Sequence, residues 1–170
     1  MRKASKEMSA EWAQDVLDRA PYITVSMTDE EGVPYALPLS LARKDEMSFY
    51  FHCAMEGRKL DILRKNPRVC LSAVTRCKPV IGPMDGSFTL EFRSAIAFGE
   101  AEMVEERGEK IEAMRLICER FLPQHMEAFD TAIARSLDHT AVVRIRLSEH
   151  PVGKRKEYDR EGEKKKWQRE

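Results

Sequence analysis

Residues 49–61 read Phe-Tyr-Phe-His-Cys-Ala-Met-Glu-Gly-Arg-Lys-Leu-Asp, and this stretch carries the strongest structural signal in the chain. Its aromatic first half is typical of a strand, the Glu-Gly pair predicts a turn, and the residues that follow predict a helix. Arg58 and Lys59 therefore stand at a helix N-terminus, where the helix dipole disfavours cations. Free N–H groups at such an end bind phosphate. We expect either a phosphate-bearing ligand here, or a solvated helix end whose cations pair with Glu56 or Asp61.

The composition describes a globular domain and excludes several function classes. The chain has 170 residues with 29 cations and 29 anions, so its net charge gives no reason to expect nucleic acid. No apolar run approaches the roughly 20 residues that a membrane span needs, and no signal peptide is visible. The four cysteines form no CxxC pair, which favours reduced thiols, no metal site and a cytoplasmic location.

The order of hydrophobic patterns predicts a mostly β fold with peripheral helices, built around an antiparallel barrel. We expect helices at residues 9–20, 58–65, 111–121 and 126–137, and strands at 22–28, 33–41, 47–52, 68–76, 87–103 and 140–147. The domain is expected to cover residues 1–152, and a charged, solvated tail residues 153–170.

Three local signals refine this pattern. Pro34 and Pro38 cannot donate to a sheet ladder, so their strand is expected at an edge, or with its backbone exposed to something other than a neighbouring strand. Residues 77–86 hold two prolines and two glycines and predict a long loop, and Gly99 predicts a bulge in the long strand. The methionine and aromatic residues of the two late helices are interpreted as core or dimer packing.

His52 and Arg93 are the candidate chemical groups outside the helix start. His52 ends its strand close to the expected phosphate turn, and its ordinary pKa lets it exchange a proton near neutral pH. The alternative is a hydrogen-bonded polar residue without a chemical role. Arg93 interrupts an apolar strand, and its charge needs a partner, which an interface or an anionic ligand would provide.

Four segments together resemble the pyridoxamine-phosphate-oxidase-like split-barrel flavoproteins, and most closely the nitroimidazole-resistance branch. They are residues 32–40 (GVPYALPLS), 50–54 (YFHCA), 57–61 (GRKLD) and 92–99 (FRSAIAFG). The resemblance implies a six-stranded antiparallel split β-barrel that forms a homodimer, with one flavin mononucleotide (FMN) in each of two clefts at the interface.

The resemblance also implies roles for particular residues. The backbone at Pro38, Leu39 and Ser40 would meet the isoalloxazine ring, and Phe51 and His52 would line the cleft. Gly57, Arg58 and Lys59 would hold the phosphate, while Arg93 and Ser94 would approach the flavin from the long strand. His52 occupies the position that the branch ties to chemistry near the flavin.

These features predict an FMN-dependent oxidoreductase that reduces a small electrophile such as a nitroaromatic, with NADH or NADPH as a candidate electron donor. Pyridoxamine phosphate is not the expected substrate, because a mixed-charge tail replaces the C-terminal residues that bind it in the oxidases. Two alternatives remain: a non-catalytic flavin or haem carrier or sensor, with His52 as a haem ligand, and an interaction module whose barrel only dimerises.

Overall fold

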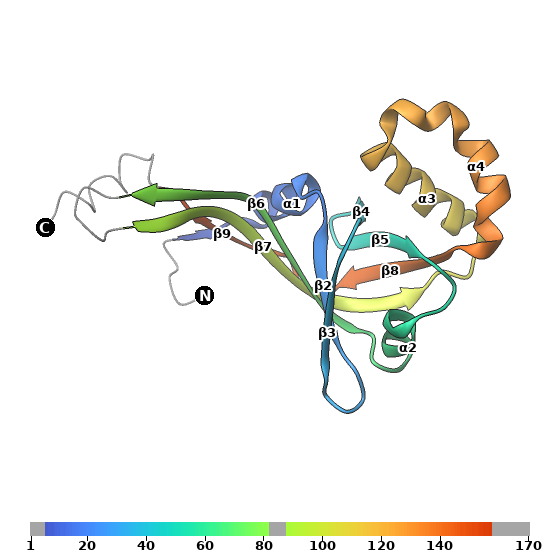
Figure 1. The fold of residues 1–170 in the computed structure, drawn as a ribbon, viewed down its shortest axis with the longest axis horizontal. Helices are drawn as coiled ribbons and strands as arrows, with labels where there is room; N and C mark the ends of the chain where they lie inside the picture. The colour runs from blue at the N-terminus through green and yellow to red at the C-terminus, as the bar shows by residue number, and fades with distance from the viewer. Residues whose placement is uncertain (1–5, 82–87, 158–170) are drawn as a thin grey trace, which may run out of the picture.

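The computed structural model describes residues 6–81 and 88–157 of the 170-residue chain (Figure 1). The strands are β1 (Glu7–Met8), β2 (Ile23–Thr28), β3 (Pro34–Leu39), β4 (Ala42–Asp45), β5 (Ser48–Cys53), β6 (Arg68–Ile81), β7 (Phe88–Met103), β8 (Ala141–Leu147) and β9 (Val152–Lys156). The helices are α1 (Ala10–Arg19), α2 (Arg58–Lys65), α3 (Arg107–Phe121) and α4 (Phe129–Ser136), with 3-10 turns at Pro123–Ala128 and Leu137–His139. No helix in these ranges is long and apolar enough to cross a membrane.

The strands form an antiparallel sheet that returns on itself. Its order is β3-β2-β6-β7-β8-β5-β4, and Ser40 and Leu41 join the first strand to the last. Because β3 and β4 act as one bent strand, the path closes as a barrel of six strands, which confirms the predicted fold class. Within the described chain β3 pairs with β2 alone, so the edge position predicted from Pro34 and Pro38 is also confirmed.

Two apolar clusters hold the barrel and its helices together. In β2 the side chains of Ile23, Val25 and Met27 point inward and are buried, the alternation expected of a half-buried strand. They belong to the main core, which also takes in α1 and α2. A second cluster packs α3 and α4 against the outside of β5 and β8, and it contains Tyr50, Met114, Ile117, Phe129, Ile133 and Leu137. The interpretation of the late helices as core packing is therefore confirmed.

A long β-arm extends β6 and β7 beyond the barrel (Figure 1). The two strands stay paired from Val74 and Ser94 to Ile81 and Phe88, with one irregularity just after Val74. The loop predicted at residues 77–86 is therefore wrong for 77–81, which continue β6, and its remaining part lies outside the described residues. Pro79 is tolerated because the described part of the arm pairs β6 with β7 alone, so Pro79 lies on an edge strand.

The barrel-side face of the arm carries charged residues that pair with one another. Glu91 is fully buried and accepts a hydrogen bond from Arg76, with 3.1 Å between Nη2 and Oε2. Arg93 contacts Glu157, and Arg155 lies 3.8 Å from the same carboxylate. Buried carboxylates persist only with such partners. The Arg93–Glu157 pair attaches the residue after β9 to β7.

The solvated tail predicted from residue 153 is wrong for residues 153–157, because 153–156 lie within β9 and Glu157 is buried, and the rest of the predicted tail lies outside the described residues. Gly153 makes this possible: a Cβ there would lie 2.5 Å from a ring atom of Trp12. Gly99 has a similar role, since its Cβ would lie 2.3 Å from the Arg146 carbonyl oxygen. The bulge predicted at Gly99 is wrong, because this glycine permits close strand approach within a regular pairing.

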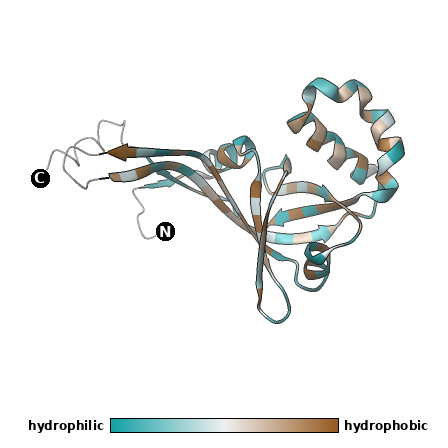
Figure 2. Ribbon diagram, in the orientation of Figure 1, coloured by the Kyte–Doolittle hydropathy of each residue, from teal (hydrophilic) through white to brown (hydrophobic). Residues whose placement is uncertain are grey.

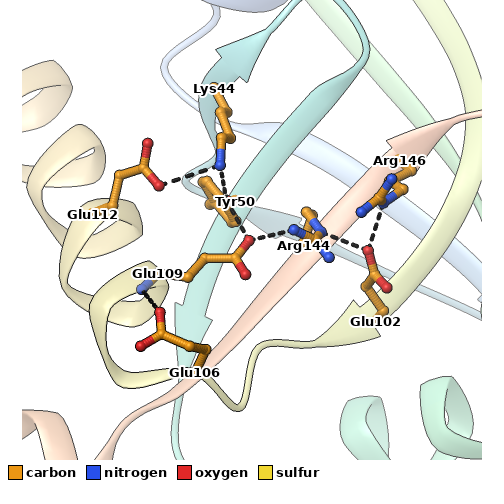
Figure 3. A network of polar contacts seen from close by, with 8 residues as sticks. All are labelled: Lys44, Tyr50, Glu102, Glu106, Glu109, Glu112, Arg144 and Arg146. Atoms are coloured by element: carbon orange, nitrogen blue, oxygen red, sulfur yellow. Dashed lines mark hydrogen bonds and ion pairs between the residues drawn. The ribbon is translucent and has the colours of Figure 1, made fainter.

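A polar network attaches α3 to the face of the sheet formed by β5 and β8 (Figure 3). The buried Tyr50 hydroxyl donates to Glu109 at 2.6 Å and accepts from Lys44 at 3.1 Å. Arg144 contacts Glu109 and also donates to Glu102 at 2.5 Å. Tyr50 precedes His52 by two positions on the same strand face, so the network fixes the strand that carries the histidine.

Arg120 joins three separate segments. Its guanidinium donates to the carbonyls of Leu17, Asp18 and Ala20, at 2.6–2.9 Å, and also contacts the Leu41 carbonyl. The first three lie at the C-terminal end of α1, where carbonyls lack helical partners. The fourth lies in the β3–β4 corner, so Arg120 holds α3, α1 and the barrel corner in one place.

We expect Arg120→Met to lower the free energy of unfolding by about 2–3 kcal/mol, because several carbonyls lose a charged donor at once. Urea denaturation measures the change. The matched control is Arg107→Met on the same helix, whose ion pair with Asp138 is 65% and 77% exposed and contributes little. Equal losses in the two variants would contradict the role given to Arg120.

Candidate functional site

Helix α2 begins between β3 and β5, and its first turn has donors without a side-chain cap. Gly57 precedes the helix with φ +132°, a conformation that side chains rarely adopt. No side chain hydrogen-bonds to the helix start, while Leu60, Ile62 and Leu63 anchor the opposite face in the core. The predicted helix bounds are confirmed, and the start has the geometry that binds anions.

Arg58 extends from this start toward β3. Its guanidinium carbon lies 5.1 Å from the centre of the Tyr35 ring, and Nη2 lies 3.7 Å from Oδ2 of Asp29. Asp29 also accepts a hydrogen bond from the Val33 amide, at 2.8 Å, which holds the β2–β3 turn. Arg58 therefore has a carboxylate of its own chain beside it, which the sequence analysis did not anticipate.

Lys59 extends in the other direction, toward β5. Its Nζ lies 5.5 Å from the centre of the Phe51 ring, and its charge acts on the neighbouring His52. Consecutive helix positions do not share a face, so the two cations predicted to act together separate at the surface. Lys59 is the one of the two whose charge acts on the predicted histidine.

The His52 side chain is exposed at the C-terminal end of β5. Desolvation by the surrounding strands, and then the positive charge of Lys59, lower the pKa of His52 below its ordinary value. The imidazole is consequently neutral at neutral pH. One ring nitrogen then donates a hydrogen bond and the other accepts one or binds a metal.

The pairing registers place His52 in one row with residues distant in sequence. Ala42 pairs with Tyr50, so continuing that register sets Ser40 opposite His52. Extending the β2–β3 register by one residue sets Ser40 opposite Tyr22. Extending the β2–β6 register by two residues sets Tyr22 opposite Val74. Val74 pairs with Ser94 on β7 and Ser94 pairs with Lys154 on β9. The sequence missed Tyr22 and Val74, which alternation along β2 and β6 places on this face.

This row lies on the outside of the barrel. Its neighbours on the same face include several exposed apolar side chains, with Tyr22 56%, Val74 51%, Phe98 50% and Ile96 44% exposed. Pro38 occupies the adjacent row, opposite Thr24 on β2. His52, Ser40, Pro38 and Ser94 therefore share one outer surface, here called the barrel outer face.

Other predicted residues point elsewhere. Phe51 is fully buried in the main core, and Leu39 packs against that core. Their backbones, but not their side chains, border the barrel outer face. Arg93 faces the opposite side from Ser94 and contacts Glu157. The charge partner that the sequence required for Arg93 thus lies in its own chain, and a role of Arg93 toward a flavin stays a prediction.

Two hollows lie on the far side of α2. A cavity of about 600 Å³ is lined by Thr28, Asp29, Glu30, Gly32, Lys65, Asn66 and Arg68. A second, of about 180 Å³, adds Glu31, Arg58, Asp61 and Ile62 to part of that set. Carboxylates outnumber cations in the lining of the smaller hollow, so it does not suit a phosphate, whereas the larger one is lined by two carboxylates and two cations.

The chain matches the pyridoxamine 5'-phosphate oxidase family over residues 9–154. Its fold is similar to flavocytochrome Anf3 of Azotobacter vinelandii, with TM-score 0.79 and 23% identity over 97% of this chain and 77% of that one. It is also similar to an FAD- and haem-binding protein of Mycobacterium smegmatis, with TM-score 0.74 and 22% identity over 89% and 74%.

A third similar structure is a provisionally assigned 5-nitroimidazole antibiotic resistance protein of Bacteroides thetaiotaomicron. Its TM-score is 0.73, with 24% identity over 88% of this chain and 87% of that one. No curated protein sequence matches the chain significantly. At these identities the solved structures establish the split-barrel fold, and the family match extends over most of the sequence. The chain belongs to the pyridoxamine 5'-phosphate oxidase family.

Proposed function

We propose that the chain binds FMN on the barrel outer face and acts as a homodimeric oxidoreductase toward a small electrophile such as a nitroaromatic. One observation carries the proposal: the extended registers set His52, Ser40 and Ser94 in one row of the barrel outer face, and His52 stands near the end of the strand that leads to the uncapped start of α2. The similar 5-nitroimidazole resistance protein supports the substrate class.

The phosphate would bind at the start of α2. Lys59 and the amide groups after Gly57 would hold it, since an uncapped first turn supplies N–H donors and the lysine a full charge. Arg58 would bind it by leaving Asp29, a pair that is 3.7 Å long and has its arginine 59% exposed. Asp29 is 19% exposed, but the pair is long and its arginine lies in water, so the arginine is readily exchanged to another anion.

The isoalloxazine ring would lie along the β3–β4 corner. β3 has one strand partner in the described chain, so backbone groups of Pro38, Leu39 and Ser40 face away from the ladder. They suit the polar edge of a flat heterocycle. When bound, the flavin supplies the redox chemistry, and His52, neutral at this position, would hydrogen-bond the substrate over it.

A second copy of the chain would supply the other wall of the site. The barrel outer face continues along β7 as exposed Ile96 and Phe98 and reaches Leu90 and Phe88 on the β-arm. Figure 2 shows hydrophobic colour at the free end of the arm. An apolar surface of this extent on a water-exposed sheet is typical of a protein interface.

Haem binding is the second candidate. A neutral, exposed histidine is a metal ligand, and similar structures include a flavocytochrome and an FAD- and haem-binding protein. The colour of the purified protein separates the two, because a flavin gives a yellow preparation and haem a red-brown one. Anaerobic NADH or NADPH should bleach the flavin band in an oxidoreductase, and a band that persists favours a carrier or sensor.

The double variant Arg58→Ala/Lys59→Ala should be folded, dimeric and colourless, because the phosphate loses both cations. Flavin absorbance per chain after purification measures occupancy, and circular dichroism with light scattering verifies fold and assembly. The matched control is Arg64→Ala/Lys65→Ala at the other end of the same helix, which should keep its flavin. Full occupancy in the first variant would refute the phosphate site.

Ile96→Glu should convert the dimer to a monomer and lower flavin affinity at least about tenfold, since a charge then stands in the proposed apolar contact. Sedimentation velocity gives the mass, and FMN titration gives the affinity. Val33→Glu is the control, because Val33 is 46% exposed against 44% for Ile96 and lies in the β2–β3 turn. A dimer unaffected by Ile96→Glu would place the interface elsewhere.

Arg93→Met distinguishes two roles of the Arg93 side chain: an ion pair with Glu157 and a contact with the flavin. If the guanidinium serves Glu157, the variant loses about 1–2 kcal/mol of stability and keeps its FMN affinity. Contact with the flavin would instead lower the affinity at unchanged stability. We expect the first result, because Glu157 is 7% exposed and Arg93 is its nearest cation. Thermal unfolding and FMN titration on the same sample decide between them.

A further inference from the structure

The outer half of the β-arm is a ribbon of only two strands. Strand β9 pairs with β7 as far as Phe92, so residues 78–81 and 88–91 pair with each other alone in the described chain. A two-stranded ribbon is marginally stable in water unless another surface packs against it. The arm points away from the barrel, on the side opposite α2 (Figure 1), so it cannot reach the candidate site of its own chain.

One face of this ribbon is apolar. Ile81 and Phe88 stand directly opposite each other and are 86% and 79% exposed, the highest values among the large apolar side chains of the described residues. Leu90 lies two positions along on the same face. The face continues along β7 to Ile96 and Phe98 on the barrel outer face. Apolar surface of this extent is typical of contact with another protein surface.

The size of this face fits a second copy of the chain. Its exposed apolar side chains present roughly 800 Å², if each fully exposed side chain counts for about 200 Å². They are Tyr22, Val74, Ile81, Phe88, Leu90, Ile96 and Phe98. A stable interface buries about 800 Å² on each partner. Because one patch serves both copies of a twofold dimer, the chain itself supplies both sides of the contact.

The arm has the length needed to reach the site of such a partner. From Ser94 to Phe88 it spans six residues, roughly 20 Å at the rise of a β-strand. Over the barrel outer face, the row from Ser94 to His52 crosses four strand spacings, roughly 19 Å. Two sheets can pack with their strands at about a right angle. If the two copies cross in this way near Ser94, each arm lies along the partner's row and ends beside the partner's His52.

The surface along this row accepts apolar side chains. Between its two ends the row contains only uncharged side chains, those of Val74, Tyr22 and Ser40. Along β7, by contrast, the outward-facing positions after Phe98 are Glu100 and Glu102, both exposed. Apolar side chains laid over carboxylates would remove water from a charge, which is costly. Charge therefore favours an arm that crosses the partner's strands over one that follows the partner's β7.

We propose that the outer face of the arm forms one wall of the candidate site of the partner subunit, with Phe88 and Ile81 beside the partner's Ser40 and His52. The inference rests on the proposed function, because it takes the chain as a dimer with its site on the barrel outer face. Each site is then built from two chains: one contributes His52 and the start of α2, and the other contributes the arm.

This wall has a consequence for the substrate. Phe88 and Ile81 offer contact area without a hydrogen-bonding group, whereas Ser40 and His52 opposite them supply polar atoms. A flat ring fits between the two walls with its face on the arm and its polar substituent toward His52. The arm thereby selects an aromatic electrophile over an aliphatic one.

Photo-cross-linking of the full chain reads the contact directly. Phe88→benzoylphenylalanine keeps an aromatic side chain and, on illumination, becomes joined to the residues next to it. The variant is mixed with isotopically heavy wild type, subunits are allowed to exchange, and the joined peptides are mapped by mass spectrometry. We expect light–heavy joins from position 88 to residues 38–41 or 52–55. Val33→benzoylphenylalanine, on the exposed β2–β3 turn, is the control and should give none.

Four results of this experiment would overturn the proposal. They are joins to residues 96–102 of the partner, joins to the partner's arm, joins within one chain only, and no joins at all. None of them depends on flavin, so the position of the arm is decided even if the chain binds no FMN. Absence of FMN binding would refute the proposed function and leave the cross-link map readable.

FMN affinity then tests whether the arm belongs to the site. Ile81→Ser/Phe88→Ser should lower the affinity about tenfold, as loss of a central interface contact does, at protein concentrations where sedimentation velocity still gives a dimer. Leu122→Ser, an exposed apolar residue directly after α3, is the control and should bind FMN like the wild type. An affinity unchanged by the double variant in the dimer would remove the arm from the site.

Discussion

Side chains of an antiparallel sheet alternate between its faces and stand opposite one another in fixed register, and this constraint organises the whole molecule. Ile23, Val25 and Met27 fill the barrel because they are the alternate residues of β2 whose side chains point inward. The residues between them point outward, and together with the outward-facing residues of β6 and β7 they form the barrel outer face. A one-residue slip between β6 and β7 would send Ile96 and Phe98 into the core and the alanines between them to the surface. Gly99 fixes the neighbouring register of β7 against β8, since only a residue without Cβ fits against the Arg146 carbonyl.

The same constraint explains the charged face of the arm. In the arm, the inward-facing residues of β6 and β7 have no barrel core to fill. Arg76, Glu91 and Arg93 therefore occupy the positions that buried alanines take within the barrel. Each carboxylate there is buried and has an arginine within reach. The arm is thus stabilised by paired charges on one face and leaves apolar side chains on the other, an arrangement that suits a partner surface more than isolation in water.

How far the sequence predicts this structure depends on whether a signal is local. The strand that carries His52 follows from a local run of aromatic residues, and the bounds of α2 follow from the Glu-Gly turn and the residues after it. These predictions were correct. The arm was missed because prolines and glycines near residue 80 favour a loop locally, whereas cross-strand pairing extends the strand. Strand β9 was missed because the charges in and after it find partners only when residues 64 positions apart meet, as Arg93 and Glu157 do.

The candidate site shows the same division. Arg58 and Lys59 were correctly placed at a helix start, but adjacency in sequence suggested a joint role that helical geometry does not give them. The carboxylates near α2, Asp29, Glu30 and Asp61, are each engaged by another cation of the helix. Lys59 keeps its charge over an aromatic ring and beside a neutral histidine, at some cost in stability that a carboxylate within reach would remove. A cation in that state, at the uncapped end of a helix and on the border of an apolar surface, is the arrangement that the proposed phosphate site requires.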